Sequence, residues 1–374
     1  MVTIQQVRPE DFPVQDNLFQ TAFWGTFKNT CGQQSFFFTV LYSDKDISFQ
    51  FPFMVLIRFR RDGSCYAYAP RAPSVSIAPE KQGILLEEIG VAVKSVFPAQ
   101  CICLRYDLAW KSLNHSDTTV LPENEQIIMN WGTKTHNLRK APGNYICPDT
   151  VIINISAAPE QILSHMRTTT RNCIRRAYRS KIEFAVKGAE ALPDWYSLYQ
   201  STALRKNFFY EKEQYFDRLF SHKHVQSNAV HEPPPREKII PLDAPAPAPQ
   251  FRIMTAEKDK KIISGIIIAL SGHNAYYMYA GSSLEQRELM PNYGLQWEAV
   301  RFARSRGCTS YDLMGIPPNN NTADSMAGLY IFKTGFGGEK VRFAGAWDFI
   351  YDTDRYKYFV LEDQMKLKSD RNSL

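Results

Sequence analysis

In the first half of the chain, stretches with the apolar pattern of strands alternate with a stretch that has the apolar pattern of a helix. Two apolar and aromatic runs, Ser35–Leu41 and Ile47–Phe59, predict strands. Residues Pro79–Val96 instead carry apolar side chains at helical spacing, which predicts a helix that ends before Pro98. The next apolar run, Cys101–Tyr106, predicts a buried strand. This order of elements favours an α/β fold.

The second half of the chain repeats this order. Ile262–Leu270 and Ala275–Ala280 predict two strands joined by a short turn. Asn292–Arg306 predicts a helix with a proline near its start and a glycine just past its end. Cys308–Met314 then predicts another strand. The second half is therefore expected to form an α/β unit of its own.

A short signature is shared by the two halves. Each half has a helix, then a short strand, then Tyr-Asp-Leu, at residues 106–108 and 311–313. An ancient duplication into two α/β units of like topology explains this match. Coincidence among common α/β patterns explains it equally well, so both interpretations stay open at this point.

A proline-rich segment, His231–Gln250, interrupts the second half and contains seven prolines. Such a segment cannot form the interior of a sheet and favours extended polyproline II structure. Strand-like sequence resumes at Phe251–Glu257. We therefore expect a surface excursion within the second domain rather than a linker between domains, either as a flexible loop or as a protein-docking segment.

The composition is that of an ordinary globular protein. The 374 residues leave room for two domains, and 22% of them are charged. The hydrophobic set makes up 44%, which excludes disorder over the whole chain. Aromatic residues reach 13%, which suits deep pockets or a broad contact surface. The net charge of +6 permits an anionic partner without requiring one.

Seven cysteines are scattered along the chain without a Cys-x-x-Cys pair. This distribution favours reduced thiols over a disulfide framework or a zinc site. Residues Met1–Phe12 have no apolar core of a signal peptide. The longest apolar run, near Ile262–Leu270, is shorter than the roughly 20 residues of a membrane span. We expect a cytoplasmic protein without a transmembrane segment.

The segment Ser164–Lys181 has the most informative charge pattern. Its arginines follow one another at four-residue steps: Arg167, Arg171, Arg175 and Arg179. On a helix they would form one stripe of like charges, which repel and cost stability. No carboxylate lies within the segment. The stripe favours a track for the phosphates of RNA or a nucleotide, and the alternative is pairing with acidic residues elsewhere in the fold.

Glycines surround a lysine in Ile331–Gly338, which reads Ile-Phe-Lys-Thr-Gly-Phe-Gly-Gly. Glycine backbone can approach a ligand closely, and Lys333 adds a point charge. The segment matches neither the Gly-x-x-x-x-Gly-Lys phosphate loop nor Gly-x-Gly-x-x-Gly. A glycine-rich turn between strands explains it equally well.

Motifs of several other enzyme classes do not occur in the sequence. Arg304–Gly307 comes nearest to the acyl-coenzyme A loop, but Thr309 stands where glycine or alanine is needed. The segment also falls at the C-terminus of a predicted helix, where the dipole disfavours phosphate. There is no His-Glu-x-x-His or Gly-x-Ser-x-Gly, and His222 and His224 lack obvious partner ligands. Metal catalysis and a serine hydrolase are not supported.

Nine short motifs are spread over most of the chain. Those of the first half lie at Phe23–Lys28, Ala69–Pro73 and Leu104–Asp107. Those of the second half lie at Thr170–Ala177, Thr202–Arg205, Tyr277–Ser283, Pro291–Trp297, Tyr311–Gly315 and Phe332–Gly338. In this order they resemble the motifs of the Fem family of peptidoglycan-bridge aminoacyltransferases, beginning with its Trp-x-x-Phe-Lys and Pro-Arg-Gly-Pro.

The resemblance implies two GNAT-like α/β domains with mixed sheets and flanking helices. Domain 1 would comprise residues 1–147 and 347–374 and bind the acceptor. Domain 2 would comprise residues 148–346 and lie on the aminoacyl-tRNA side. The implied reaction moves an amino acid from aminoacyl-tRNA to an amine of the stem peptide, carried by UDP-MurNAc-pentapeptide or lipid II. The tRNA is then a co-substrate, and no cofactor or metal is expected.

The sequence departs from the family pattern at several places. Ala72 replaces a usual glycine and Leu108 a usual proline, and the proline-rich segment is unusual. The long coiled-coil arm of some members is missing, since no sustained heptads occur. The chain is similar to shorter members, several of which act on a soluble nucleotide-linked precursor. The acceptor stays open between soluble and lipid-linked forms, as does peripheral association with the inner face of the membrane.

The resemblance also implies roles for individual residues. Lys28 and Arg205 would bind the phosphates of the acceptor, which suits a lysine and an arginine physically. Lys333 would face the reacting carbonyl, and Phe332 would stack on the 3′ adenosine of the tRNA. From its charge pattern, the arginine stripe is predicted to contribute to tRNA binding.

Aromatic and acidic residues complete the candidate site. Tyr277 and Tyr279 lie two apart on one predicted strand, so both rings are expected on the same face, in the pocket or in an aromatic core. Asp107 is the first carboxylate to consider as a base, or it accepts hydrogen bonds at a strand end. The vicinal hydroxyl of the tRNA or a water could move the proton instead. An acyl-coenzyme A transferase and a non-catalytic RNA-binding protein remain as alternatives.

Overall fold

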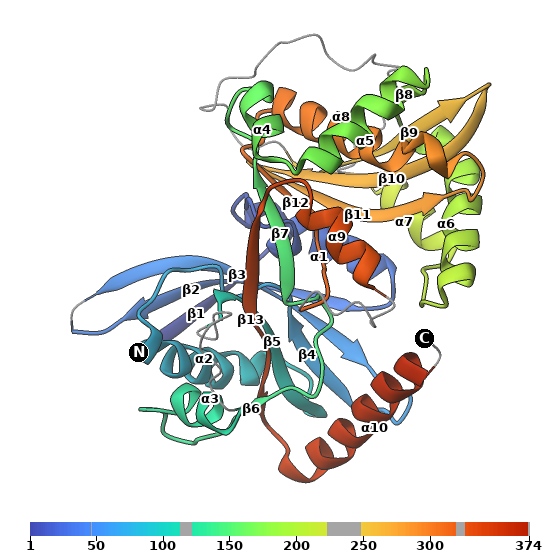
Figure 1. Ribbon diagram of the computed structural model, residues 1–374. Helices are drawn as coiled ribbons and strands as arrows, with labels where there is room; N and C mark the ends of the chain where they lie inside the picture. Colours follow the sequence, from blue (N-terminus) through green and yellow to red (C-terminus); the bar gives the residue numbers. More distant parts are fainter. Residues whose placement is uncertain (46, 113–121, 223–247, 319–325, 373–374) are drawn as a thin grey trace. The chain divides into compact units, whose positions relative to one another are not determined.

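The computed structural model describes residues 1–45, 47–112, 122–222, 248–318 and 326–372 (Figure 1). Contacts divide the chain into two compact units. Unit 1 comprises Met1–Pro148 and Arg342–Ser369, and unit 2 is built on Asp149–Val341. Each unit has a mixed sheet with flanking helices, which confirms the predicted α/β class. Most of the proline-rich segment, residues 231–247, lies outside the described residues.

The sheet of unit 1 has the strand order β1-β2-β3-β4-β5-β13, with β6 paired to β13. The strands are β1 (Val2–Val7), β2 (Gln34–Ser43), β3 (Ser48–Phe59), β4 (Cys65–Ala69), β5 (Cys101–Lys111), β6 (Leu138–Lys140) and β13 (Glu339–Ile350). Strands β1 to β4 pair antiparallel, β4 and β5 pair parallel, and β13 is antiparallel to β5. The first residues of β13, up to Val341, belong to unit 2.

The helices of unit 1 are α1 (Ala22–Thr30), α2 (Pro79–Val93), α3 (Pro122–Met129) and α10 (Thr353–Asn372). Short 3-10 helices lie at Pro9–Asp11, Leu18–Gln20 and Lys94–Val96. Helix α2 is the crossover between the parallel strands β4 and β5 and begins with proline, as helices often do. It contacts α3 closely, since a Cβ on Gly83 would collide with the carbonyl of Met129.

The sheet of unit 2 has the strand order β7-β12-β11-β10-β9-β8. The strands are β7 (Asp149–Asn154), β8 (Glu183–Lys187), β9 (Gln250–Lys258), β10 (Lys261–Ser271), β11 (Asn274–Ser282) and β12 (Ser310–Asp312). Strands β8 to β11 pair antiparallel, β11 and β12 pair parallel, and β7 is antiparallel to β12.

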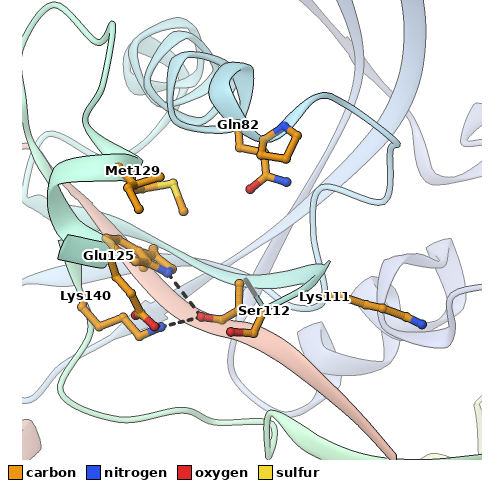
Figure 2. A pocket seen from close by; sticks show the side chains of 10 residues that line it. Gln82, Lys111, Ser112, Glu125, Met129 and Lys140 are labelled. Carbon is orange, nitrogen blue, oxygen red and sulfur yellow. Dashed lines mark hydrogen bonds and ion pairs between the residues drawn. The ribbon is translucent and has the colours of Figure 1, made fainter. Parts of the chain in front are cut away.

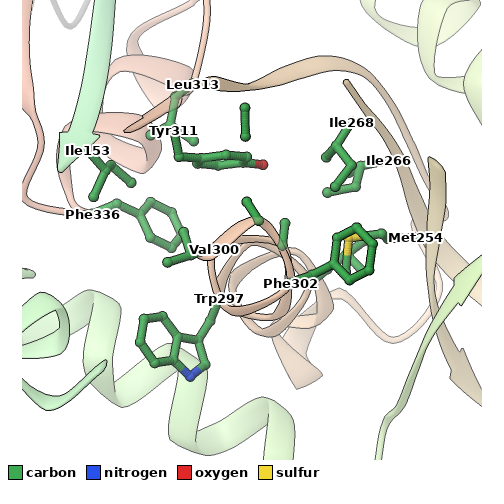
Figure 3. Packing of buried hydrophobic residues seen from close by; sticks show 14 of the residues in the cluster. Ile153, Met254, Ile266, Ile268, Trp297, Val300, Phe302, Tyr311, Leu313 and Phe336 are labelled. Atoms are coloured by element: carbon green, nitrogen blue, oxygen red, sulfur yellow. The ribbon is translucent and has the colours of Figure 1, made fainter. Parts of the chain in front are cut away.

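The helices of unit 2 are α4 (Pro159–His165), α5 (Thr168–Arg179), α6 (Leu192–Lys206), α7 (Glu213–Ser221), α8 (Pro291–Ser305) and α9 (Ala327–Thr334). Short 3-10 helices lie at Ala189–Ala191 and Arg287–Leu289. Helix α8 is the crossover between β11 and β12. Figure 3 shows its Val300 beside Phe336, in a buried apolar core that also contains Tyr311 and Ile268 of the sheet. Helix α5 packs against α8, and α6 contacts β10 and β11.

The two sheets have the same topology. Each has four antiparallel strands, a helical crossover, a parallel strand and a final antiparallel strand. The shared tyrosine plays the same part in both: the Tyr106 hydroxyl donates to the Leu86 carbonyl of α2 at 2.7 Å, and the Tyr311 hydroxyl donates to Gln296 of α8 at 2.9 Å. This correspondence favours duplication over coincidence as the origin of the repeat.

Some predicted elements have different bounds in the structure. Strand β5 extends to Lys111, well past the predicted end at Tyr106, whereas β12 covers only Ser310–Asp312. Residues Ile331–Thr334 form the end of a helix rather than part of a turn between strands. Within the described part of the chain, no helix combines the length and the apolar character needed to cross a membrane.

Candidate functional site

Strands β11 and β12 pair over only three residues and then separate. The last pair in register is Tyr276 with Asp312, after which β11 continues to Ser282 paired with β10 but no longer with β12. The chain turns away from β11 after β12. Asp312 accepts the backbone N–H of Met314 at 2.7 Å, and Met314 has a left-handed φ of 57°. This point of separation, at the carboxyl end of β12, is where candidate site residues of unit 2 meet.

A β-bulge separates Tyr277 from Tyr279. Tyr277 lies opposite Ile268 and Tyr279 opposite Ile267, so Met278 is an extra residue in β11. A bulge shifts the alternation of side chains by one position. The expectation that both rings point the same way is therefore wrong: Tyr277 packs with the α8 core, whereas Tyr279 contacts α7, with its hydroxyl 3.2 Å from that of Tyr215.

Lys333 lies in the last turn of α9 and is buried, with 6% of its surface exposed. Its ammonium donates to the carbonyl oxygens of Gly315 at 2.8 Å and Met314 at 3.3 Å, just after β12. The same ammonium lies 5.2 Å from the centre of the Tyr277 ring. A cation at a helix C-terminus is favoured by the dipole. The structure thus places Lys333 and Tyr277 together where β11 and β12 separate.

The Tyr277 hydroxyl is hydrogen-bonded to the Gln296 side chain, whose carbonyl oxygen accepts a hydrogen bond from Tyr311. Burial raises the pKa of Tyr277, and it raises the pKa of Tyr311 well above the ordinary value. Both hydroxyls therefore stay protonated at neutral pH. Tyr277 can shape the site and shield the ammonium of Lys333, but it is not suited to act as a base.

The glycines that follow Lys333 pack against protein. A Cβ on Gly337 would collide with the carbonyl of His165, and one on Gly338 with that of Ile152. Gly337 also has a left-handed φ of 77°. The segment is a tight turn from α9 into β13, and close packing against α4 and β7 explains its glycines. The ring of Phe332 is half-buried against Tyr293, with ring centres 4.9 Å apart.

The arginine stripe lies on α5, with one member outside the helix. Arg167 occupies the N-cap position with extended backbone, and Arg171, Arg175 and Arg179 follow on the helix. The opposite face, at Thr170, Ile174 and Ala177, is buried. The four-residue spacing therefore predicted the face of the helix that carries the arginines. It did not predict that Arg167 lies before the helix, at the N-cap.

Hydrogen bonds of the stripe lead to neutral groups. Arg171 donates to the carbonyl of Met166, and Arg175 donates to the Asn172 side chain at 2.9 Å. Among the described residues, no ion pair joins the stripe to a carboxylate, which weighs against the pairing alternative. The Arg167 N–H donates to the Gly335 carbonyl at 2.9 Å. The start of the stripe thus adjoins the turn that follows Lys333.

Asp107 lies within β5, before its end at Lys111, and is fully buried. It accepts hydrogen bonds from the Tyr68 hydroxyl at 3.2 Å and the Ile146 N–H at 3.1 Å. Burial raises its pKa, an effect that the charge of Arg71 opposes. The predicted location at a strand end is thus wrong because β5 is longer than expected. The role of Asp107 as a base stays a prediction.

Arg71 is a partner of Asp107 that sequence reasoning did not identify. Its guanidinium lies 3.9 Å from the Asp107 carboxylate, donates to the Cys147 carbonyl at 2.8 Å and covers the Phe343 ring. The backbone N–H of Ala72 donates to the Asp107 carbonyl at 2.9 Å. The motif Ala69–Pro73 contained the signal, since its arginine is the charged residue between two prolines.

The two predicted phosphate-binding residues lie in different units. Lys28 is half-buried on α1, with its ammonium 4.7 Å from the centre of the Trp24 ring. Arg205 is exposed in the last turn of α6 and donates to the Ser282 carbonyl at 3.1 Å and to Thr202 at 3.3 Å. In both cases neighbouring groups orient the cation. Their joint role in acceptor binding stays a prediction.

Comparison with known proteins gives consistent matches. The model of the FemAB family matches residues 11–223 and 250–363. Proteins named lipid II:glycine glycyltransferase are 22% identical over 253 residues in Staphylococcus epidermidis and 23% identical over 259 residues in Staphylococcus aureus. These alignments cover 57% of this chain and 61% and 62% of those proteins. The chain therefore aligns with about three fifths of the length of these relatives.

A solved structure also matches over almost the whole chain. The crystal structure of FemX superimposes with a TM-score of 0.71 at 15% identity. The match covers 96% of this chain and 99% of FemX. It shows that the two proteins share their fold.

Proposed function

Because the chain belongs to the FemAB family, we propose that it transfers an amino acid from aminoacyl-tRNA to an amine of the peptidoglycan stem peptide. The names of its relatives support this proposal, since lipid II:glycine glycyltransferase describes transfer of an amino acid to a peptidoglycan precursor. The acceptor would be lipid II or the soluble UDP-MurNAc-pentapeptide. We place the protein in the cytoplasm, with peripheral access to the membrane where the acceptor is lipid-linked.

The proposed reaction is aminolysis of an ester. The acceptor amine attacks the carbonyl that joins the amino acid to the tRNA, a C–N bond forms and the C–O bond to the ribose breaks. The attacking nitrogen loses a proton, and the departing ribose oxygen gains one. Because the ester is already activated, positioning of the two substrates and stabilisation of the oxyanion are the main tasks of the protein. No cofactor is needed.

The arginine stripe carries the tRNA part of the proposal. Arg171, Arg175 and Arg179 cover one face of α5, and their hydrogen bonds lead to neutral groups in the described structure. A row of cations of this kind suits a nucleic-acid backbone, whose phosphates repeat at short intervals. The stripe begins beside the turn that follows Lys333.

Lys333 is the residue we propose for oxyanion stabilisation. It is buried, its ammonium is oriented by two carbonyls, and it lies where the parallel strands separate. A cation oriented before the reaction can stabilise developing negative charge without rearrangement. Phe332, next to it and half-buried, would offer its ring to the terminal adenosine of the tRNA.

A transfer assay tests the proposal. The purified protein is incubated with charged tRNAs and either lipid II or UDP-MurNAc-pentapeptide, and the product is analysed by mass spectrometry. A precursor heavier by an amino-acid residue, formed only with charged tRNA, supports the proposal. Product formed from acyl-coenzyme A instead would establish the alternative transferase class. RNA binding without product from any charged tRNA and acceptor would leave the non-catalytic alternative.

A further inference from the structure

Unit 1 contains a pocket that is lined by none of the candidate site residues described above (Figure 2). It lies between the first turn of α2, with Pro79 and Gln82, and the end of β5, with Ser112. Helix α3 and strand β13 complete the wall. The carboxyl end of a parallel strand beside the start of its crossover helix is a common position for ligands in α/β proteins. The pocket is partly open, and its empty space is about 490 Å³ when the solvent-filled mouth is counted.

The floor of the pocket is apolar. Trp347 of β13, Met129 of α3 and Ala344 line it, and Trp347 is held in place because its indole N–H donates to the Ala344 carbonyl at 3.3 Å. Trp347 and Met129 are almost fully buried. A fixed aromatic ring beside a flexible thioether suits a small apolar side chain, since a thioether adapts to irregular shapes.

One cation and one anion lie side by side at this floor. The ammonium of Lys140 donates to the Ala344 carbonyl at 2.5 Å and lies 5.0 Å from the centre of the Trp347 ring. The Glu125 carboxylate is 3.4 Å from it. Charge-assisted hydrogen bonds are typically about 2.7–2.9 Å long, so this ion pair is loose. A ligand with both charges could contact the two partners without leaving either one unpaired.

Further polar groups face the same space. Figure 2 shows the amide of Gln82 directed from α2 toward the strands, with Ser112 below it, whereas Lys111 extends away from the other side chains. The start of α2 has no side-chain cap at Ala78. The helix dipole favours a negative group near this end. A carboxylate is therefore favoured on the Lys140 and α2 side, and an ammonium beside Glu125.

We propose that this pocket binds a free apolar α-amino acid in its zwitterionic form. The carboxylate of the ligand contacts Lys140 and Gln82, its ammonium contacts Glu125, and its side chain packs on Trp347 and Met129. The site belongs to unit 1 alone and is independent of the proposed transfer reaction. Its ligand is recognised by two opposite charges on one carbon together with an apolar side chain.

Isothermal titration calorimetry of the full chain tests this proposal, without tRNA or acceptor. The probes are L-leucine and L-methionine, with N-acetyl-L-leucine and L-leucinamide as analogues that lack the ammonium and the carboxylate charge, respectively. We expect a free amino acid to bind and both analogues to bind at least about tenfold more weakly, the scale of one charge-assisted hydrogen bond. Equal affinity for either analogue would overturn zwitterion recognition, and no binding of either free amino acid would overturn the site.

Variants locate the binding. Lys140→Met and Glu125→Gln each remove one charge and keep much of the side-chain volume, and each should weaken binding about tenfold or more. The control is Lys134→Met, which changes an exposed lysine a few residues before β6, the strand that carries Lys140. This variant should keep the wild-type affinity. Circular dichroism and thermal melting check that each variant is folded. Wild-type affinity in both folded pocket variants would place the ligand elsewhere and contradict the proposal.

Discussion

The two units contain the same strand signature in different surroundings. In unit 1, β5 continues past Asp107 to Lys111, and the segment after β4 closes on it through the hydrogen bond from Ala72. In unit 2, β12 ends at Asp312 and the chain turns away, so β11 and β12 separate. Lys333 of α9 donates to the carbonyls of that turn.

Within the Tyr-Asp-Leu signature, the contacts of the tyrosine are alike in the two units, whereas the surroundings of the aspartate differ. The tyrosine reaches its crossover helix in both units, through Tyr106 and α2 or Tyr311 and α8. The aspartate side differs: Asp107 is buried among Tyr68, Ile146 and Arg71, whereas unit 2 brings a buried lysine to the end of the strand. We infer that the contacts of Asp107 in unit 1 are structural, in place of the predicted role as a base, and that the chemistry of transfer lies in unit 2.

The largest effect is expected from Lys333→Met. If Lys333 stabilises the oxyanion, kcat should fall by roughly 10²–10³, the scale for losing one such donor. KM for both substrates should barely change, because the interaction strengthens only in the transition state. Steady-state kinetics measures both constants. The matched control is Lys340→Met, which alters an exposed lysine on β13. A raised KM with an intact kcat would instead make Lys333 a binding residue.

Replacing the two predicted phosphate ligands should affect acceptor binding next most strongly. Lys28→Ala and Arg205→Ala should each weaken acceptor binding by about 1.5–3 kcal/mol, the value of a charge-assisted hydrogen bond. tRNA affinity should stay the same. Calorimetry with each single variant measures the effect in each unit separately, and Lys206→Ala is the control beside Arg205. Unchanged acceptor affinity in both variants would remove them from the site.

The arginine stripe should make tRNA binding depend more strongly on salt concentration. If Arg171, Arg175 and Arg179 contact phosphates, their replacement by glutamine should reduce the slope of log K against log salt by about 0.7–0.9 per lost contact. Filter binding at several salt concentrations measures the slope. A control triple change at Lys258, Lys260 and Lys261, on the β9–β10 turn, removes the same charge. Equal slopes in the wild type and the stripe variant would make the stripe structural.

The smallest effect is expected on the pH dependence of thermal stability, through Asp107. Burial raises its pKa, so the folded state holds the proton more firmly than the unfolded state does. Its contribution to stability is then complete below the unfolded pKa of about 3.9 and is lost as pH rises through the raised folded value. Asp107→Asn has no such titration. The Tm of the wild type minus that of the variant should therefore decrease from acid to neutral pH. A difference that grows with pH would contradict this account of Asp107.

Much of the fold could be predicted from local sequence. The spacing of apolar residues predicted α2 and α8, and apolar runs predicted the strand pair β10 and β11. The proline in the first turn of α8 and the left-handed Gly307 after the helix are local signals that the structure retains. The repeated Tyr-Asp-Leu left duplication and coincidence equally open, and the shared strand order of the two units, with the same strand after a crossover helix in each, favours duplication.

Features that depend on distant parts of the chain could not be predicted in this way. The bulge at Met278 changes the face of Tyr277, and only the register with β10 shows it. Lys333 was identified from its glycine-rich neighbourhood, but the glycines pack against α4 and β7, which are far away in the sequence. The pairing of Asp107 with Arg71 likewise depends on how β4 and β5 are joined.

A single-turnover comparison of two variants tests the assignment of chemistry to unit 2 most directly. Wild type, Lys333→Met and Asp107→Asn are each mixed with saturating aminoacyl-tRNA and acceptor, and the rate is normalised to folded protein. The account predicts a loss of roughly 10²–10³ in the chemical rate for Lys333→Met. It predicts the wild-type rate for Asp107→Asn, because that carboxylate is buried in a structural network. A full chemical rate in Lys333→Met, together with a large loss in Asp107→Asn, would contradict it.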